Sequence, residues 1–177
     1  MTTRTKIWKA VEDTKNSLII HSVNLACNLL AGDPASRFLR KSLLSLIGAK
    51  IGRETAIAGG GYFGCGKITT GENVFINRRC YFDGEDWVHI GSNVVIGHGV
   101  TFVTAKHQMG DSVRRAGKVT GVPIHIGDGV WIGSNTVILP GVVIGKGTVV
   151  GAGSVVLEDL PENVVAVGVP AKVKGAL

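Results

Sequence analysis

The chain has 177 residues, a length that suits one compact domain with its own core. It is 45% hydrophobic but only 6% aromatic, and it contains 26 glycines. Its three cysteines are odd in number and form no CxxC pair, which argues against a disulfide framework and for a reducing compartment. The formal net charge is +6, yet residues 1–50 hold eight basic and three acidic residues and no nucleic-acid-binding motif accompanies them, so nucleic-acid binding is not expected.

Residues 1–50 read as a helical segment. The first sixteen residues are rich in charge and lack a clear cleavage site, so no signal peptide is expected and the protein is predicted to be cytoplasmic. The run SLIIHSVNLACNLLA, residues 17–31, is interrupted by His21, Asn24 and Asn28, which makes it too short and too polar to span a bilayer. It is better explained as a buried or interfacial helix.

The motif AGDPAS, residues 31–36, predicts a break before a second helix, with Asp33 and Ser36 as possible N-caps. That helix, SRFLRKSLLSLIG, carries an apolar stripe at helical spacing beside Arg37, Arg40 and Lys41. Such a stripe can cover the end of a core, or it can lie on an anionic membrane surface. Peripheral membrane contact through the N-terminal helices therefore stays open.

From Ile51 onward the chain repeats every six residues. An inward aliphatic residue recurs in strict phase, and the members of the longest run are Ile126, Ile132, Ile138, Ile144, Val150 and Val156. Short strands separated by Gly, Asn and Asp turns close a triangular coil of eighteen residues, and such coils stack as parallel strands about 4.8 Å apart. The pattern predicts an all-β parallel β-helix over residues 51–160, followed by a tail at 161–177.

The repeat breaks once, between Phe102 and Ile126. Removing eighteen of the intervening residues restores the six-residue step, so residues 107–121 are predicted to leave the stack as an excursion loop. Arg114, Arg115 and Lys118 keep this loop solvated. Long excursions from a compact scaffold usually serve function.

Three segments together resemble a known family. The motif TAKH with its basic loop, the run VPIHIGDGVWIGSNTVILPGVVIGKGTVVGAGSVV, and PENVVAVGVPAKV are similar to the hexapeptide-repeat acetyltransferases of the galactoside and maltose O-acetyltransferase type, over roughly residues 60–174. The resemblance implies a left-handed β-helix, acetyl-CoA as co-substrate, and a homotrimer with active sites in clefts between neighbouring chains.

The resemblance also assigns the chemistry. His107, in the T-A-x-H setting, corresponds to the catalytic histidine and would act as general base toward an acceptor hydroxyl, for which an imidazole is suited at neutral pH. Asn77 corresponds to an asparagine that binds the acceptor sugar. Asp83 and Glu85, with Asp86, lie one turn later and would bind acceptor hydroxyls or orient His107.

The donor side is assigned in the same way. Trp131 corresponds to a tryptophan of the cleft wall, and its position just before an inward aliphatic predicts that it faces outward. Ser134 and Ala152 correspond to positions whose backbone meets the pantetheine arm, and Lys172 and Lys174 to a basic tail that reaches the phosphates of coenzyme A. The chain departs from the family in three places. Gln108 replaces the usual proline, and residues 1–50 do not resemble the short helical segment with which such enzymes help to close the acceptor site. Leu157-Glu158 replaces a Thr-Lys pair, which puts a carboxylate where a cation is expected.

These assignments predict acetyl-CoA-dependent O-acetylation of a sugar, a polysaccharide precursor or a hydroxylated natural product. N-acetylation of an amino sugar, a non-catalytic β-helix scaffold and, more distantly, serine O-acetylation are the alternatives. His89 and His125 occupy equivalent phases and should stack one coil apart, but without carboxylate or thiolate partners they do not predict a metal site.

Overall fold

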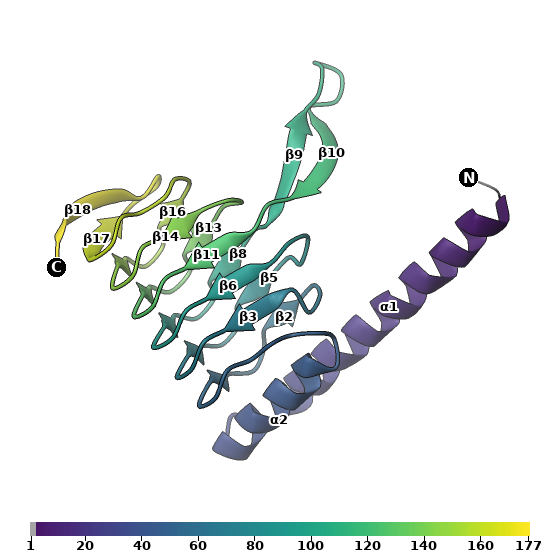
Figure 1. Cartoon of the computed structure of the whole chain (residues 1–177), viewed down its shortest axis with the longest axis horizontal. Helices are drawn as coiled ribbons and strands as arrows, with labels where there is room; N and C mark the ends of the chain where they lie inside the picture. The colour runs from purple at the N-terminus through teal and green to yellow at the C-terminus, as the bar shows by residue number, and fades with distance from the viewer. Residues whose placement is uncertain (1–2) are drawn as a thin grey trace.

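The computed structural model describes residues 3–177, with side chains from residue 11 onward. It consists of two helices and a three-sided coil of short parallel strands, and it confirms the predicted left-handed parallel β-helix (Figure 1). Helices α1 (Thr3–Leu29) and α2 (Pro34–Ser45) lie at one end of the coil. Asp33 caps α2 by accepting a 3.0 Å hydrogen bond from the Ser36 N–H, which satisfies one of the free donors of the first helical turn.

The coil has three faces, each a parallel sheet. Face A contains β3 (Ile68–Thr70), β6 (Val88–Ile90), β11 (Ile124–Ile126) and β14 (Val143–Ile144). Face B contains β1 (Ala56–Ile57), β4 (Phe75–Ile76), β7 (Val95–Ile96), β12 (Trp131–Ile132), β15 (Val149–Val150) and β17 (Val164–Val167). Face C contains β2 (Tyr62–Phe63), β5 (Tyr81–Phe82), β8 (Thr101–Phe102), β13 (Val137–Ile138) and β16 (Val155–Val156).

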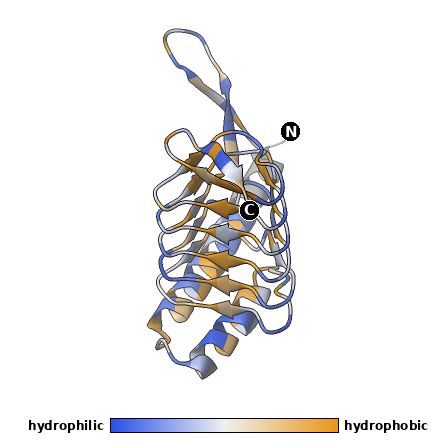
Figure 2. Cartoon of the chain, turned by 90° about the vertical axis from the view of Figure 1, so that its left-hand side faces the viewer, coloured by the Kyte–Doolittle hydropathy of each residue, from blue (hydrophilic) through white to orange (hydrophobic). Residues whose placement is uncertain are grey.

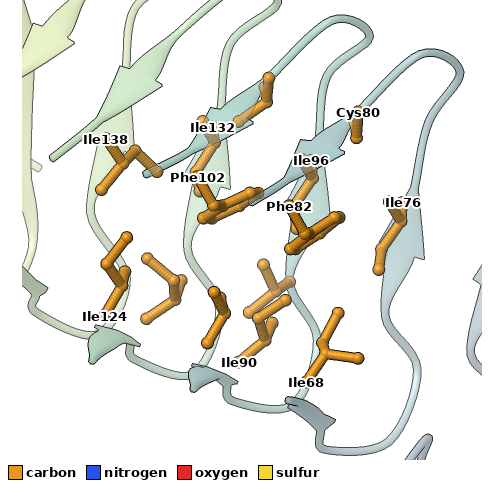
Figure 3. Packing of buried hydrophobic residues seen from close by; sticks show 14 of the residues in the cluster. Ile68, Ile76, Cys80, Phe82, Ile90, Ile96, Phe102, Ile124, Ile132 and Ile138 are labelled. Atoms are coloured by element: carbon orange, nitrogen blue, oxygen red, sulfur yellow. The ribbon is translucent and has the colours of Figure 1, made fainter. Parts of the chain in front are cut away.

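The six-residue period arises because each face takes one large inward side chain per coil at the same strand position, with a second buried residue two positions earlier. On face B, Ile76, Ile96 and Ile132 are in register and at most 1% exposed. On face C, the rings of Phe63, Phe82 and Phe102 stack with centroids 5.0 and 4.6 Å apart. Figure 3 shows side chains from all three walls filling the space between them. Burying each large side chain contributes roughly 1.5–3 kcal/mol, so the stacked ladders form the core of the molecule.

Corners between faces repeatedly need a left-handed backbone conformation. At the corner between faces B and C this position is taken in successive coils by Gly60, Arg79, Gly99, Asn135 and Gly153, all with positive φ. Glycine and asparagine tolerate this conformation, whereas other residues pay about 1–2 kcal/mol for it. Figure 2 shows the result, hydrophobic strands joined by more hydrophilic corners.

Helix α1 covers the open edge of the first coil. The Asn24 amide donates to the Phe63 carbonyl (2.9 Å) and accepts from the Phe63 N–H (2.8 Å), and Asn28 accepts from the Gly60 N–H (2.8 Å). The two asparagines that interrupt the apolar run of α1 therefore bond backbone groups of the first coil, which an uncovered edge would leave unpaired. At the same end, Leu44 of α2 is fully buried.

The apolar stripe expected on α2 is only partly available to a membrane. Phe38, Leu39 and Leu46 are exposed, but Arg40 is 1% exposed and Lys41 donates to the Gly52 carbonyl at 2.6 Å. The surface beside the stripe is thus less basic than the sequence predicts. No helix in the described part of the chain is long and apolar enough to cross a membrane.

The excursion is an antiparallel hairpin of β9 (Ala105–Met109) and β10 (Ala116–Gly121), so it begins two residues before the predicted bound (Figure 1). It leaves the coil between β8 on face C and β11 on face A and stands away from the body. At the far end, β17 pairs in parallel with β15, so the stack continues beyond residue 160, and β18 (Lys172–Ala176) folds back antiparallel on β17.

Candidate functional site

His107 lies in the middle of β9, with its side chain exposed to solvent. Its Nδ1 is 3.1 Å from the carbonyl oxygen of Gly117 on the paired strand. Because a carbonyl oxygen can only accept, Nδ1 carries the proton in this contact, and Nε2 keeps its lone pair in the neutral ring. The hairpin therefore holds the imidazole in the tautomer that a general base requires, with the basic nitrogen pointing away from the bonded strand.

Asp83 holds the root of the hairpin. Its carboxylate accepts from the backbone N–H groups of Thr104 (2.7 Å) and Ala105 (2.9 Å), and from the Thr104 hydroxyl. Thr104 and Ala105 are the residues through which the chain leaves the coil toward His107. Both oxygens of Asp83 are thus engaged within the chain, which favours the orienting role over direct contact with an acceptor.

Glu85 and Asp86 lie at the same corner, between faces C and A. The Glu85 carbonyl accepts from the Lys67 ammonium (2.7 Å), while its carboxylate is exposed. The Asp86 N–H donates to the Thr104 hydroxyl (2.9 Å), and the Asp86 carboxylate accepts from the next backbone N–H, that of Trp87 (2.8 Å). Of the three acids, Glu85 has the carboxylate that is free to meet a ligand.

Asn77, Ser134 and Ala152 lie at a different corner, between faces B and C, and the coil of β7 and β8 separates Asn77 from Ser134. The Asn77 side-chain oxygen accepts from the Arg78 N–H (2.8 Å), and its amide N–H groups have no partner among residues 11–177. Among the described residues, the backbone N–H groups of Ser134 and Ala152 have no acceptor, whereas the neighbouring Gly133 N–H bonds the Val150 carbonyl (2.7 Å). Two unpaired backbone donors at one corner fit a ligand that carries carbonyl or amide oxygens.

Trp131 projects from the outside of face B and is 56% exposed, as its phase predicts. Lys172 and Lys174 lie on β18 at the upper end of the same face. The Lys172 ammonium is 3.5 Å from the Glu158 carboxylate, in an exposed pair. The carboxylate of the Leu157-Glu158 departure thus meets one of the two lysines expected to hold phosphate, and exposed pairs of this kind are weak.

One chain does not bring these residues into a single site. His107, Asp83 and Glu85 are grouped at the corner between faces C and A, whereas Asn77, Ser134 and Ala152 line the corner between faces B and C. Face C, with its strands and outward side chains, lies between the two groups. A site that uses both groups needs a second copy of the chain.

Sequence reasoning missed four polar residues near the corner between faces B and C. His98 lies in the same column as Ser134, and its Nδ1 is 2.9 Å from the Ser134 hydroxyl. Arg78 and Arg79 follow Asn77 directly, and Arg40 reaches this end of the coil from α2. The pair Arg78-Arg79 was visible beside Asn77 in the sequence, but nothing there connects it with Arg40, because that contact depends on how the helices pack.

The remaining reactive side chains sit in other surroundings. Cys27 and Cys80 are buried and Cys65 is half-buried, all as free thiols. Burial raises the pKa of the Cys80 thiol to about 11, so it is protonated at neutral pH and a poor nucleophile. His89 and His125 stack with centroids 4.7 Å apart, as predicted. Among residues 11–177, no three His, Cys, Asp or Glu side chains are placed to hold a metal ion together.

The sequence and the fold are both similar to those of known proteins. The family model "Bacterial transferase hexapeptide (six repeats)" matches residues 123–158. The structure superposes on a hexapeptide-repeat acetyltransferase from Vibrio cholerae, solved with acetyl coenzyme A, with a TM-score of 0.78 and 30% identity over 94% of this chain and 89% of that one. The chain belongs to the hexapeptide-repeat acetyltransferases.

Two further members of the hexapeptide-repeat acetyltransferases have known acceptor classes in their names. A galactoside acetyltransferase solved with coenzyme A has a TM-score of 0.76 and 32% identity, covering 92% of this chain and 81% of that chain. The galactoside O-acetyltransferase of Escherichia coli is 41% identical over 135 residues, 76% of this chain and 66% of that protein. The chain thus spans between about half and two thirds of the length of the curated relatives it matches.

Proposed function

We propose that this protein is an acetyl-CoA-dependent O-acetyltransferase that acts on a hydroxyl group of a saccharide or a hydroxylated natural product, with His107 as general base. The observation that carries the proposal is the 3.1 Å contact between His107 Nδ1 and the Gly117 carbonyl, since it leaves Nε2 unprotonated in the neutral ring. The names of the related proteins support acetyl-CoA as donor and a sugar as acceptor.

The reaction needs little more than a base and a place for negative charge. His107 Nε2 would take the proton of the acceptor hydroxyl while that oxygen attacks the thioester carbonyl carbon. The unpaired N–H groups of Ser134 and Ala152 would donate to the thioester oxygen or to the amides of the pantetheine arm. As the tetrahedral intermediate collapses, the carbon–sulfur bond breaks and the imidazolium of His107 returns the proton to the departing thiolate.

The two residue groups described above would meet in a homotrimer. His107 of one chain would face Asn77, Trp131 and Ser134 of its neighbour, with the hairpin closing the cleft from the side. Lys172 and Lys174 would lie along the same face, toward the phosphates of the donor. Oligomers of this kind are closed and symmetric, so three equivalent sites would form. Analytical ultracentrifugation checks the state, and a monomer with full turnover would contradict it.

The first test is thiol release from acetyl-CoA with a panel of sugars, amino sugars and hydroxylated natural products. His107→Ala should lose about 10²–10⁴-fold in acceptor-dependent turnover, because general base catalysis contributes that much, while coenzyme A still protects the variant against heat. Gln108→Ala, the next residue on the same exposed strand, serves as the control and should keep most of the activity. Equal turnover by His107→Ala and the control would remove His107 as the base.

Two other functions have specific support. A perosamine N-acetyltransferase from Caulobacter crescentus superposes with a TM-score of 0.56 and 29% identity over 72% of this chain, which favours an amine acceptor as the runner-up. Analysis of the product distinguishes an ester from an amide. A non-catalytic scaffold would agree with the Glu158–Lys172 pair, and it would show neither turnover nor protection by coenzyme A.

A further inference from the structure

A cavity of about 280 Å³ lies between the end of α1 and the lowest coils at the corner of faces B and C. Three arginines and three glycines contribute most of its wall: Arg40, Arg78, Arg79, Gly32, Gly59 and Gly60. Of the side chains that the structure describes, no acidic one lines it. We call it the arginine cavity, and neither the general base nor the donor residues proposed above line it.

Among residues 11–177, no carboxylate pairs with the arginines of the cavity. Arg40 is 1% exposed, and its guanidinium donates only to carbonyl oxygens, among them those of Cys27 (2.8 Å) and Ala31 (2.7 Å). The guanidinium groups of Arg78 and Arg79 make no ion pair or hydrogen bond with any residue from 11 to 177. A buried cation bonded only to neutral groups, with two more cations beside it, creates a positive potential that attracts an anion.

The glycines keep the space in front of the arginines open. A Cβ at Gly59 would lie 2.9 Å from Arg40 Nη2, a Cβ at Gly32 would lie 3.1 Å from Arg78 Nη2, and one at Gly60 would lie 3.4 Å from Arg79 Cγ. The absence of a Cβ at each glycine thus leaves room for one arginine side chain. Side chains at these three positions would press on the arginines or fill the cavity.

The backbone conformation of Arg79 also indicates that its side chain is needed. Its φ of +59° lies in the left-handed region, as do those of Gly60, Gly99, Asn135 and Gly153 in the other coils at this corner. Arg79 is the one residue of these five with a long side chain, and the left-handed conformation is less favourable for arginine than for glycine or asparagine. Unfavourable backbone geometry of this kind is retained where the side chain is needed.

We propose that the arginine cavity binds the anionic group of the acceptor, so that the acceptor is an acidic saccharide bearing a carboxylate or a phosphate. The proposal rests on the proposed function, because Asn77, the residue assigned to the acceptor, directly precedes Arg78 and Arg79. Guanidinium groups match carboxylate and phosphate oxygens in paired hydrogen bonds, a geometry that a neutral sugar does not use. The acceptor would enter with its charge at the α1 end and its hydroxyl toward the neighbouring His107.

The test measures binding and turnover separately. Methyl β-D-glucuronide, α-D-glucose 1-phosphate and the neutral methyl β-D-glucoside are titrated calorimetrically into protein saturated with coenzyme A, so that the donor site cannot take up the phosphate. The variants are Arg79→Asn, which fits the left-handed backbone, and Arg78→Gln. Arg53→Gln is the matched control, since Arg53 is exposed at another corner and pairs with Glu72 at 2.7 Å.

We expect one or both charged sugars to bind wild type at least tenfold more tightly than the glucoside, and Arg79→Asn to lose that preference by about tenfold without losing thermal stability. Arg53→Gln should bind as wild type does. Equal binding of charged and neutral sugars, or unchanged binding by Arg79→Asn and Arg78→Gln, overturns the proposal, even if acetyl transfer is observed. Anion binding that depends on Arg79 without any turnover supports the cavity and counts against the proposed function alone. The two charged sugars distinguish a carboxylate from a phosphate.

Discussion

The root of the hairpin offers a sharp test of how His107 is positioned. Asp83→Ala removes the carboxylate oxygen Oδ2, which accepts from both the Thr104 N–H and the Ala105 N–H, at 2.7 and 2.9 Å. The substitution therefore leaves both backbone donors without their acceptor. The strand that carries His107 begins at Ala105, so its direction depends on these bonds.

The size of the effect follows from the bonds lost. A hydrogen bond to a charged group contributes about 1.5–3 kcal/mol, and an unsatisfied buried donor costs a similar amount. Because Asp83 is only half-buried, water can replace part of the loss, and we expect about 1.5–2 kcal/mol of destabilisation. A base displaced by about 1 Å can lose roughly 10²-fold in rate, so kcat should fall about 10–100-fold with the KM for acetyl-CoA unchanged.

Steady-state kinetics with the best acceptor, together with hydrogen exchange of residues 105–121, measure both effects. Asp111→Ala is the matched control, because one oxygen of the Asp111 carboxylate also accepts from two backbone N–H groups, those of Val113 and Arg114 at 3.0 Å each, but at the tip of the hairpin. It should leave kcat within about twofold. A raised acceptor KM with normal kcat in Asp83→Ala would show that Asp83 binds the acceptor, and would refute the positioning argument.

Two further predictions concern stability. Asn24→Ala removes both partners of the Phe63 backbone and should destabilise by about 2–4 kcal/mol in urea unfolding at fixed protein concentration. Ser22→Ala, on the exposed side of α1, should change little, and equal effects of the two would contradict the edge-capping role. Burial, and then the charge of His125, lower the pKa of His89, with Asp86 acting the other way. The unfolded chain thus binds the proton more readily, so the free energy of unfolding should fall as pH drops below about 6.5, and His89→Gln should weaken that dependence. A pH dependence that His89→Gln leaves unchanged would contradict this.

The repeat was readable from sequence because it follows directly from coil geometry. Each face takes one large inward residue per coil at a fixed position, so Ile76, Ile96 and Ile132 had to recur in phase, and Trp131, one position earlier, had to point outward. The same arithmetic located the excursion to within two residues. It could not show that the excursion is a hairpin, since the pairing of β9 with β10 depends on contacts across a turn that carries no hexad signal.

The charged residues were harder to place, because their partners come from elsewhere in the fold. Arg40 reads as part of a basic surface stripe, but the packing of α2 against α1 buries it beneath the carbonyl groups at the end of α1. Asp83 reads as one of three equivalent acids, and only the path of the chain at Thr104 separates it from Glu85. Sequence periodicity shows on which side of a strand a residue lies. It does not show which parts of the chain a side chain at a corner will contact.

The most direct test of the account is whether two inactive chains restore activity together. His107→Ala and Asn77→Ala are unfolded together in equal amounts and refolded, so that subunits mix at random. If each site takes His107 from one chain and Asn77 from its neighbour, every mixed trimer has one site in which both residues are intact. Averaged over all randomly assembled trimers, about a quarter of the sites are then intact, and activity should return to about a quarter of wild type. Activity no higher than that of the separate variants would mean that each site lies within one chain, and would contradict the account.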